Sequence, residues 1–202
     1  MTLDGLNTRH KDGASERRRQ ILDIAAELFA RKGYRGTSIR DIGDKAGVLG
    51  GSLYHHIKSK DALFVELHNE ALNAASARIV AAMAAQSDPW ERLRAACGTM
   101  LEIQCNSNML TLPKMNDFHE VPENVRTALI ECRDAFEAPF AALIEGLPLP
   151  EEIDRSIYRN LLLGLLNSVA DWYHPGRLSP REIGDQVYRI FRRNCPAADR
   201  DG

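Results

Sequence analysis

The sequence has few cysteines and no long apolar run. No stretch approaches the roughly 18 uncharged apolar residues of a membrane-spanning helix, and residues 1–13 lack the apolar core of a signal peptide. The four cysteines show no Cys-x-x-Cys spacing, so neither a disulfide framework nor a zinc site is indicated. They are Cys97, Cys105, Cys132 and Cys195. We therefore expect a cytoplasmic protein with reduced thiols.

Catalytic motifs are also missing. There is no glycine-rich phosphate loop, no Gly-x-Ser-x-Gly and no His-Glu-x-x-His. His55 and His56 are adjacent, and because neighbouring helical residues point in different directions they form a poor chelate. A second candidate set for a metal is His119 with Asp117 or Glu120. We expect no enzyme, no metal and no cofactor.

Charge is unevenly distributed along the chain. The formal net charge is -2, but residues 1–62 carry 12 Lys and Arg against 8 Asp and Glu, whereas the remainder carries 14 against 20. The positive excess in the first third favours a polyanionic partner for that part of the chain.

Apolar residues recur at intervals of three and four, without sustained alternation of period two. This spacing is typical of amphipathic helices, so we expect an all-α fold. The first helix is predicted over residues 16–32, ending at Gly33, which suits the left-handed conformation of a helix C-cap. Two short helices follow around Gly47, one reaching about Ala46 and one over residues 50–56. This arrangement predicts a helix-turn-helix.

The rest of the chain is expected to form five longer helices. Capping residues and prolines at first helical positions mark several of their starts, and Pro139 is expected to kink the helix that contains it. The predicted starts lie near Lys60, Pro89, Glu123, Glu151 and Pro180.

Two consecutive segments resemble the DNA-binding region of the TetR family of transcription regulators. The segment from Ile24 to Thr37 resembles its first helix, and the segment from Thr37 to Leu63 resembles its helix-turn-helix signature. The resemblance implies a DNA-binding domain of three helices over residues 16–62. It also implies a larger helical domain for effector binding and dimerisation over residues 63–195.

The resemblance assigns DNA contacts to polar residues of the helix-turn-helix. Thr37 and Ser38 lie at a predicted helix N-terminus, whose free N–H groups suit a phosphate. Tyr54 and His55 are expected to project from the recognition helix. The predicted contacts are Thr37, Ser38, Ser52, Tyr54, His55 and Lys60. The pair Gly50-Gly51 departs from the family pattern, and it leaves fewer side chains there for reading bases.

A small apolar core is expected to hold the recognition helix in place. Its predicted members are Leu28, Phe29, Ile39, Ile42, Ala46, Val48 and Leu53. Ahead of the first helix, Arg9, Lys11 and residues 17–19 add positive charge. They form either an arm that reaches DNA or a solvated tail with a basic first turn. We expect residues 1–15 and 196–202 to be disordered.

The resemblance further implies a homodimer, in which the last two helices pair with their copies across a two-fold axis. Residues 161–166 are apolar on more of the helix circumference than one intrachain face requires. The residues predicted for this interface are Leu162, Leu166, Val169, Tyr188 and Phe191. A dimer would also place two recognition helices on a pseudo-palindromic operator.

A ligand cavity among the central helices is likewise implied. The candidates to line it are mainly apolar, with a few polar groups, and each is also readily explained as ordinary core. They are Trp90, Met100, Gln104, Phe118, Phe136, Phe140, Asn167, Asp171 and Trp172.

Residues 172–179 resemble TetR regulators that respond to acyl-CoA thioesters of fatty-acid or steroid-ring breakdown. Residues 108–119, together with Arg126 or Arg133, would then suit a phosphate-bearing effector. A competing hypothesis is control of an efflux pump, in which an acidic residue binds a cationic drug. The acidic candidates are Asp117, Glu131 and Asp171. A third hypothesis, from another class, is an architectural protein that binds DNA without sequence preference.

Overall fold

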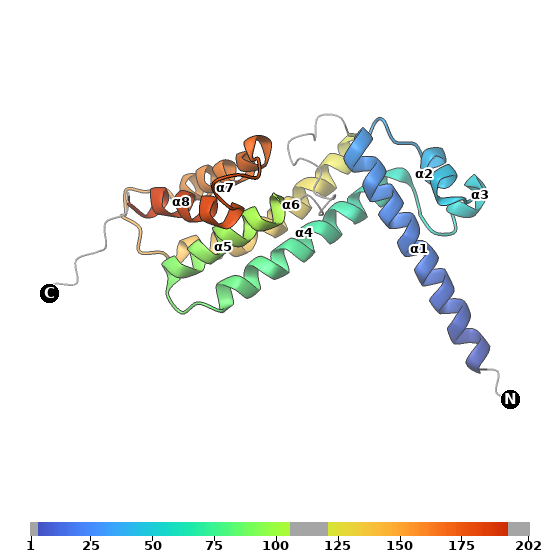
Figure 1. The fold of residues 1–202 in the computed structure, drawn as a ribbon, viewed down its shortest axis with the longest axis horizontal. Helices are drawn as coiled ribbons and strands as arrows, with labels where there is room; N and C mark the ends of the chain where they lie inside the picture. The colour runs from blue at the N-terminus through green and yellow to red at the C-terminus, as the bar shows by residue number, and fades with distance from the viewer. Residues whose placement is uncertain (1–3, 106–120, 194–202) are drawn as a thin grey trace. The chain divides into compact units, whose positions relative to one another are not determined.

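The computed structural model describes residues 4–105 and 121–193, with side chains from residue 15 onward, and every regular element among them is a helix (Figure 1). The helices are α1 (Asp4–Lys32), α2 (Ile39–Ala46), α3 (Gly50–Leu53), α4 (Lys60–Ala84), α5 (Pro89–Gln104), α6 (Glu123–Glu145), α7 (Arg155–Trp172) and α8 (Pro180–Arg193). The expected all-α fold is confirmed. None of these helices combines the length and the apolar content that a membrane span requires.

The chain divides into two compact units. The first unit comprises Met1–Ala71 with Leu110–Cys132, and the second comprises Leu72–Met109 with Arg133–Gly202. Helices α4 and α6 each contribute residues to both units. The domain boundary predicted after residue 62 therefore lies in the first turn of α4.

Helix α1 is longer than its apolar pattern predicted. It begins at Asp4, inside the stretch that was expected to be disordered, instead of at Glu16. Its buried stripe starts only at Ile21. Because periodicity detects the turns that pack against a core, it does not locate a helix start that precedes the packed residues. The predicted end is confirmed, since Gly33 has a φ of 71° and donates its N–H to the Phe29 carbonyl at 2.9 Å.

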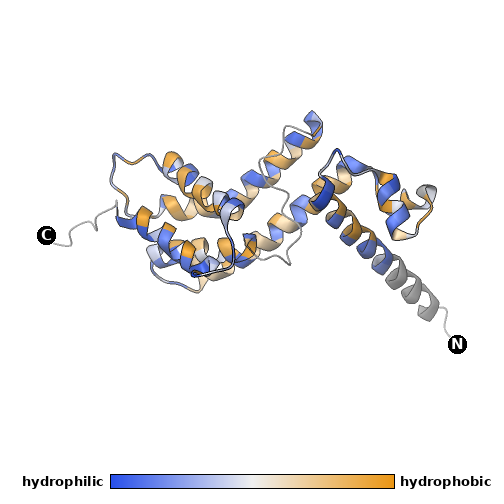
Figure 2. Cartoon of the chain, turned by 45° about the horizontal axis from the view of Figure 1, so that its top comes forward, coloured by the Kyte–Doolittle hydropathy of each residue, from blue (hydrophilic) through white to orange (hydrophobic). Residues whose placement is uncertain are grey.

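The core of the first unit joins the apolar faces of α1 to α4 and of the first half of α6 (Figure 2). Its buried residues are Ile21, Ala25, Leu28, Phe29, Ile42, Ala46, Leu53, Ile57, Leu63, Phe64, Val125 and Leu129. Five of the seven predicted core residues are buried, and the other two, Ile39 and Val48, lie half-buried at the edge. Val125 and Leu129 were not predicted, because their distance along the chain hides their contact with this core.

Helix α2 is closed at both ends by local hydrogen bonds. The Ser38 hydroxyl accepts the Asp41 N–H at 3.1 Å, and the Asp41 carboxylate accepts the Ser38 N–H at 2.8 Å. This reciprocal arrangement satisfies two N–H groups at the helix start. Gly47 ends α2 with a φ of 64°, a conformation that glycine adopts without steric cost.

Helix α3 is shorter than the predicted 50–56. Its helical residues end at Leu53, and Tyr54 is its C-cap. Backbone bonds nevertheless continue past that point, because His56 and Ile57 donate their N–H groups to the Leu53 carbonyl at 2.9 and 3.1 Å. The predicted two short helices around a glycine turn are therefore present, with a tight turn in place of the last part of the second.

In the second unit, α5 and α8 cross at two glycines. A Cβ built on Gly184 would lie 2.8 Å from the Cα of Gly98 and 2.9 Å from the carbonyl carbon and oxygen of Cys97. These distances are shorter than non-bonded atoms tolerate, so the backbones of the two helices touch here. Any larger residue at position 184 would force the helices apart.

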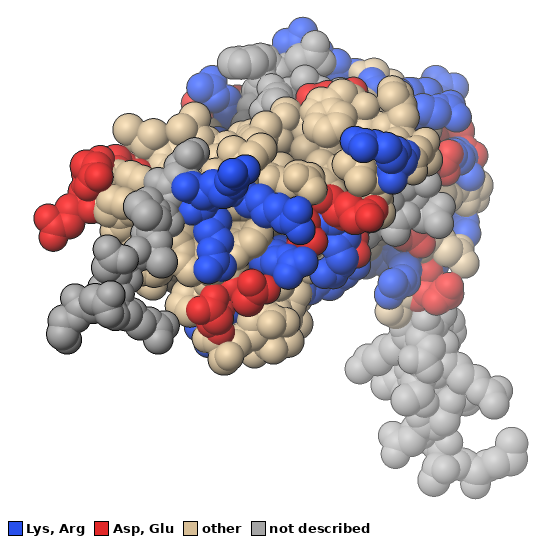
Figure 3. All heavy atoms as spheres, turned by 60° about the vertical axis from the view of Figure 1, so that its left-hand side comes forward, with Lys and Arg blue, Asp and Glu red and all other residues tan. Residues whose placement is uncertain are grey.

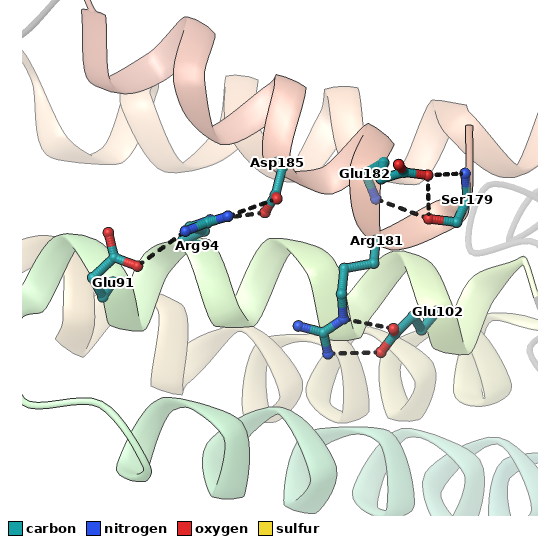
Figure 4. A network of polar contacts seen from close by, with 7 residues as sticks. All are labelled: Glu91, Arg94, Glu102, Ser179, Arg181, Glu182 and Asp185. Atoms are coloured by element: carbon teal, nitrogen blue, oxygen red, sulfur yellow. Dashed lines mark hydrogen bonds and ion pairs between the residues drawn. The ribbon is translucent and has the colours of Figure 1, made fainter. Parts of the chain in front are cut away.

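Two ion pairs flank the glycine crossing. Arg94 of α5 donates to Asp185 of α8 at 3.0 and 2.8 Å, and Arg181 of α8 donates to Glu102 of α5 at 2.7 and 2.9 Å (Figure 4). Both pairs are bidentate, which adds geometric specificity. Because the earlier residue of α5 pairs with the later residue of α8, these contacts fix an antiparallel register.

The predicted helix starts in the second unit are largely confirmed. Asp88 caps α5 by accepting the Trp90 N–H at 2.9 Å, and the Ser179–Glu182 capping box opens α8. Helix α7 begins at Arg155, later than the predicted Glu151, because Asp154 is its N-cap. Helix α6 continues through Pro139 as one element.

Candidate nucleic-acid interface and effector unit

The polar side chains of the segment around α3 lie on the surface of the first unit. Ser52, Tyr54 and His55 are exposed, Tyr54 by 60%. Leu53 and Ile57 are buried between and after them. The segment is therefore anchored to the core through its apolar residues, while its polar residues remain available to a partner.

Thr37 does not belong to that surface. Its side chain is 0% exposed, and its hydroxyl donates to the Gly33 carbonyl at 2.9 Å, with the Leu28 carbonyl at 3.2 Å. A hydroxyl enclosed in this way closes the turn after α1 and does not reach a phosphate. This corrects the predicted DNA contact of Thr37. Its neighbour Ser38 is exposed, although its side chain is engaged in capping α2.

Lys60 is held at the start of α4 by an aromatic ring. Its Nζ lies 4.0 Å from the centroid of the Tyr34 ring, a cation–π contact. Partial burial lowers the pKa of Lys60. The Tyr34 hydroxyl donates to Asp61, and burial together with this carboxylate raises the pKa of Tyr34 to about 12. Lys60 is thus half-buried and oriented.

The basic run at residues 17–19 is partly used inside the protein. Arg17 donates to the Ala46 carbonyl at 2.7 Å, at the end of α2, and Arg18 pairs with Glu66 of α4 at 2.5 Å. Arg19 is exposed. Two of the three arginines therefore fix α1 against α2 and α4, an outcome that neither proposed interpretation of this charge included.

Two features of this surface were not predicted, an exposed leucine and a groove. Leu49 is 85% exposed directly before α3. His56 and Lys58 join Tyr54 and His55 in lining a groove of about 530 Å³, together with Arg18, Ile57, Ala62, Leu63 and Glu66. The exposure of Leu49 could have been predicted from the sequence. Leu49 lies between Val48 and two glycines, outside both of the predicted short helices, so it belongs to the buried face of neither.

The residues predicted to line an effector cavity lie mostly in the second unit. Trp90, Met100, Phe136 and Phe140 are buried there. This burial agrees with a cavity lining and equally with ordinary core. Phe118 lies outside the described residues.

A polar contact connects α5 and α7 in this unit. The Gln104 side-chain nitrogen Nε2 donates to the Asn167 side-chain oxygen Oδ1 at 2.7 Å, while the Gln104 side-chain oxygen Oε1 is buried without a partner among the described residues. Both residues were predicted as polar members of the lining. Asp171 and Trp172, also predicted, are exposed on α7.

The predicted dimer interface falls largely inside the protomer. Leu162, Leu166 and Val169 are 0% exposed, and Tyr188 is buried with them. Phe191 is half-buried and packs edge-to-face on Tyr158 at 5.1 Å between ring centroids. Since four of the five side chains are already buried in their own chain, they are not free to contact a partner, which corrects that prediction.

The adjacent stripe of the same helices is exposed instead. Leu161 is 63% exposed, although it immediately precedes the buried Leu162. The other exposed apolar residues of α7 and α8 are Ile157, Leu165, Trp172 and Ile190. Several of them line a largely apolar groove of about 470 Å³ with Ile153, Tyr158 and Phe191. The second unit therefore presents an apolar surface that residues 121–193 and the described part before them leave uncovered.

Basic side chains also gather on this unit. Figure 3 shows Lys and Arg side chains clustered on the face turned toward the viewer. On α8, Gln186, Arg189, Ile190, Arg192 and Arg193 line a groove of about 280 Å³. Arg192 is held in place by the Tyr188 hydroxyl at 2.6 Å and by the Trp90 ring at 5.5 Å.

The described residues give no metal centre. No group of three or more His, Cys, Asp or Glu in residues 15–105 and 121–193 is placed to bind an ion. The candidate set of His119 with Asp117 or Glu120 lies outside the described residues. Cys97, Cys105 and Cys132 are unbridged, and burial raises the pKa of the Cys97 thiol to about 12.

Both parts of the chain match known families. Residues 21–67 match the family described as bacterial regulatory proteins, tetR family, and residues 86–195 match the family described as tetracyclin repressor-like, C-terminal domain. Among curated proteins, the HTH-type transcriptional repressor KstR2 of Mycolicibacterium smegmatis is 39% identical over 183 residues, which cover 87% of this chain and 89% of the relative.

Solved structures have a similar fold. The ketosteroid transcriptional regulator KstR2 of Mycobacterium tuberculosis is 25% identical, with a TM-score of 0.68 over 87% of this chain and 92% of that one. The crystal structure of AibR in complex with isovaleryl coenzyme A and operator DNA has a TM-score of 0.74 over 86% and 97%, at 22% identity, and this second likeness shows the fold alone.

Proposed function

The chain belongs to the TetR family of bacterial transcription regulators, and we propose that it is a dimeric repressor, released from its operator by an acyl-CoA thioester. On this proposal the protein is a regulator and not an enzyme, and it acts on DNA in the cytoplasm.

DNA binding is assigned to the surface around α3. The observation that carries this assignment is the exposure of Ser52, Tyr54 and His55 on a segment anchored by Leu53 and Ile57, within the residues that match the family's DNA-binding region. A short, rigidly held helix fits a major groove about 12 Å wide. Ser38 and Lys60 remain proposed contacts to the phosphate backbone.

The dimer is assigned to the exposed stripe of α7 and α8. Ile157, Leu161 and Ile190 are each more than half exposed. Apolar side chains that remain uncovered in one chain are typical of a surface that pairs with a copy. A two-fold axis would place two recognition helices about 34–36 Å apart, the spacing of consecutive major grooves.

The effector is assigned to the second unit. The structure of AibR, which shares the fold, holds isovaleryl coenzyme A, and this supports an acyl-CoA effector. KstR2 of Mycobacterium tuberculosis is a ketosteroid transcriptional regulator, and this supports a link to steroid metabolism. The buried set of Trp90, Met100, Phe136 and Phe140 supplies apolar surface for an acyl group. No specific observation favours control by a cationic drug, and an architectural protein would not need this unit.

Release follows from differential affinity. An effector shifts the equilibrium between two dimer conformations only to the extent that it binds one of them better. We expect the acyl-CoA to favour a conformation in which the separation of the recognition helices no longer matches the operator.

The first test is selection of bound fragments from sheared DNA of the source genome at near-physiological salt. We expect recovery of a few sites with a pseudo-palindromic motif. Tyr54→Ala should lose these sites and keep the oligomeric state, because Tyr54 is exposed and outside the core. Diffuse recovery without a motif would overturn sequence-specific repression.

The second test separates the two neighbouring leucines of α7. Leu161→Arg should give monomers in light scattering with a folded protomer, because the side chain is exposed. Leu162→Ala should instead lower the free energy of unfolding by about 2–5 kcal/mol, as buried Leu→Ala changes do. A dimeric Leu161→Arg protein would place the interface elsewhere.

The third test addresses the effector. An acyl-CoA series is added to the complex of protein and operator, with free coenzyme A and a lipophilic cation as controls, and the bound fraction is followed by fluorescence anisotropy. We expect release by one or more thioesters only. Release by the cation alone would contradict the proposed effector class.

A further inference from the structure

Leu49 is an exposed apolar residue that the fold does not use. Its side chain is 85% exposed, the highest value among the large apolar residues of the described chain. It contributes nothing to capping α3 through its side chain. Isolated exposed leucines are ordinary on protein surfaces. This one, however, stands immediately before the recognition helix.

The backbone around Leu49 is held firmly. The Leu49 carbonyl accepts the N–H groups of Ser52 and Leu53 at 2.9 and 3.2 Å, and the Val48 N–H donates to the Gly43 carbonyl at 2.9 Å. Leu53 is fully buried. The exposed side chain is therefore displayed from a fixed position.

Gly51 is a second residue that the fold does not explain. It lies inside α3 with an ordinary helical conformation, since the described glycines with positive φ are Gly33 and Gly47. Among the residues that the structure describes, no atom lies within 4 Å of a Cβ built on Gly51. Glycine in a helix is less favourable than alanine by about 1 kcal/mol. The protein itself gives no reason for this missing side chain, whereas a partner that approaches the backbone would.

The exposed Leu49 and the missing side chain at Gly51 together form a surface that a partner with a flat face can approach closely. Gly51 leaves the backbone of α3 accessible, and Leu49, two residues earlier in the chain, exposes an apolar side chain. Ser52 and His55 add polar groups on the same segment. A base pair in the major groove has this combination of properties, because its edge is flat and polar, and thymine adds one apolar group, the C5-methyl.

We propose that Leu49 is a specificity-determining residue that contacts the C5-methyl group of a thymine in each operator half-site, with Gly51 permitting the close approach. This inference rests on the proposed DNA-binding function. It goes beyond the assignment of Ser52, Tyr54 and His55, since it predicts a base preference that needs no hydrogen bond.

The experiment removes the methyl group from the DNA. Each thymine of the selected operator is replaced in turn by deoxyuridine in one half-site, which deletes the methyl and keeps the base pairing. We expect one position at which the substitution weakens binding of the wild-type protein about fourfold, the effect of one buried methyl-sized group. Leu49→Ala should bind less tightly and should not distinguish thymine from deoxyuridine at that position.

Leu49→Met is the matched control, because it keeps an apolar side chain of similar size and should retain the distinction. Gly51→Ala should weaken operator binding while leaving the free energy of unfolding equal or slightly higher. The inference is overturned if no thymine shows the effect, or if Leu49→Ala remains equally sensitive to deoxyuridine. Failure to recover any operator would instead contradict the proposed function.

Discussion

Two sites of this protein, the segment around α3 in the first unit and the crossing of α5 and α8 in the second, use glycine and polar side chains in opposite ways. In the first unit, Gly51 occupies open space and the polar residues around α3 are exposed. In the second unit, Gly184 has no room for a single carbon, and the charged pairs beside it join one helix to another. The residues around α3 therefore remain available to a partner, whereas the glycine crossing of α5 and α8 and its ion pairs build the interior of the second unit.

This difference indicates where substitutions should affect function and where they should affect folding. Changes on the exposed part of α3 should alter affinity for DNA and spare stability. Changes at the crossing of α5 and α8 should alter stability first. The chain offers a convenient probe, because its two tryptophans, Trp90 and Trp172, are both in the second unit. Tryptophan fluorescence therefore reports that unit, and far-ultraviolet circular dichroism reports both.

The largest expected effect is that of Gly184→Ala. The new Cβ would overlap backbone atoms of Gly98 and Cys97, which cannot rotate away as a side chain can. We expect the free energy of unfolding to fall by about 3 kcal/mol or more. The measurement is urea denaturation followed by tryptophan fluorescence, with Gly51→Ala as the matched control. If both variants unfold like the wild type, the contrast between the two glycines does not hold.

The next effect concerns pH and belongs to the first unit. His68 of α4 is 1% exposed, and burial lowers its pKa to about 4. Its folded pKa lies below the unfolded value of 6.5, so its contribution is fully present above about pH 6.5 and is lost as the pH falls toward 4. Between pH 7 and pH 5 we expect a loss of about 2 kcal/mol.

Circular dichroism in urea at both pH values measures this loss, and His68→Leu should remove most of it. The tryptophan signal should move less than the dichroism if the two units unfold separately. If the tryptophan and dichroism transitions shift together, the two units unfold as one, and the expected difference in stability between the units is wrong.

The smallest expected effect is the coupling between Arg94 and Asp185. Their bidentate contact is half-exposed, and the Arg94 guanidinium holds the pKa of Asp185 below its usual range. Exposed pairs contribute up to about 1 kcal/mol. A double-mutant cycle with Arg94→Met and Asp185→Leu should give about that coupling energy and little change in operator affinity. A large loss of DNA binding in either single variant would contradict a purely structural role.

The sequence predicted the first unit in more detail than the second. Local signals sufficed for the C-terminal ends of α1 and α2, for the exposure of Tyr54 and His55, and for most of the small core, because these depend on residues close together in the chain. Thr37 was placed wrongly, since a helix cap and a buried turn residue look alike in sequence. Arg17 and Arg18 were read as surface charge, and their partners lie 29 and 48 residues away.

In the second unit, the apolar periodicity identified α7 and α8 but not which face of each helix is buried and which is exposed. The run from Leu161 to Leu166 is apolar around most of the helix, so the sequence pattern allows either face of α7 to pack against the core of the protomer. Helix α7 packs against α5 and α8, and this packing decided that Leu162 and Leu166 point inward and that Leu161 does not. A similar limit applies to Gly98 and Gly184, which are 86 residues apart and give no joint signal.

By itself, the sequence determined the all-helical class, the helix-turn-helix and the family, because each of these depends on local spacing and on residue types at fixed offsets. The three-dimensional packing establishes which apolar stripe stays exposed for a partner, which cations remain available to DNA, and where two helices touch. These properties arise from contacts between distant segments, and each contact depends on volumes and distances that no local pattern contains.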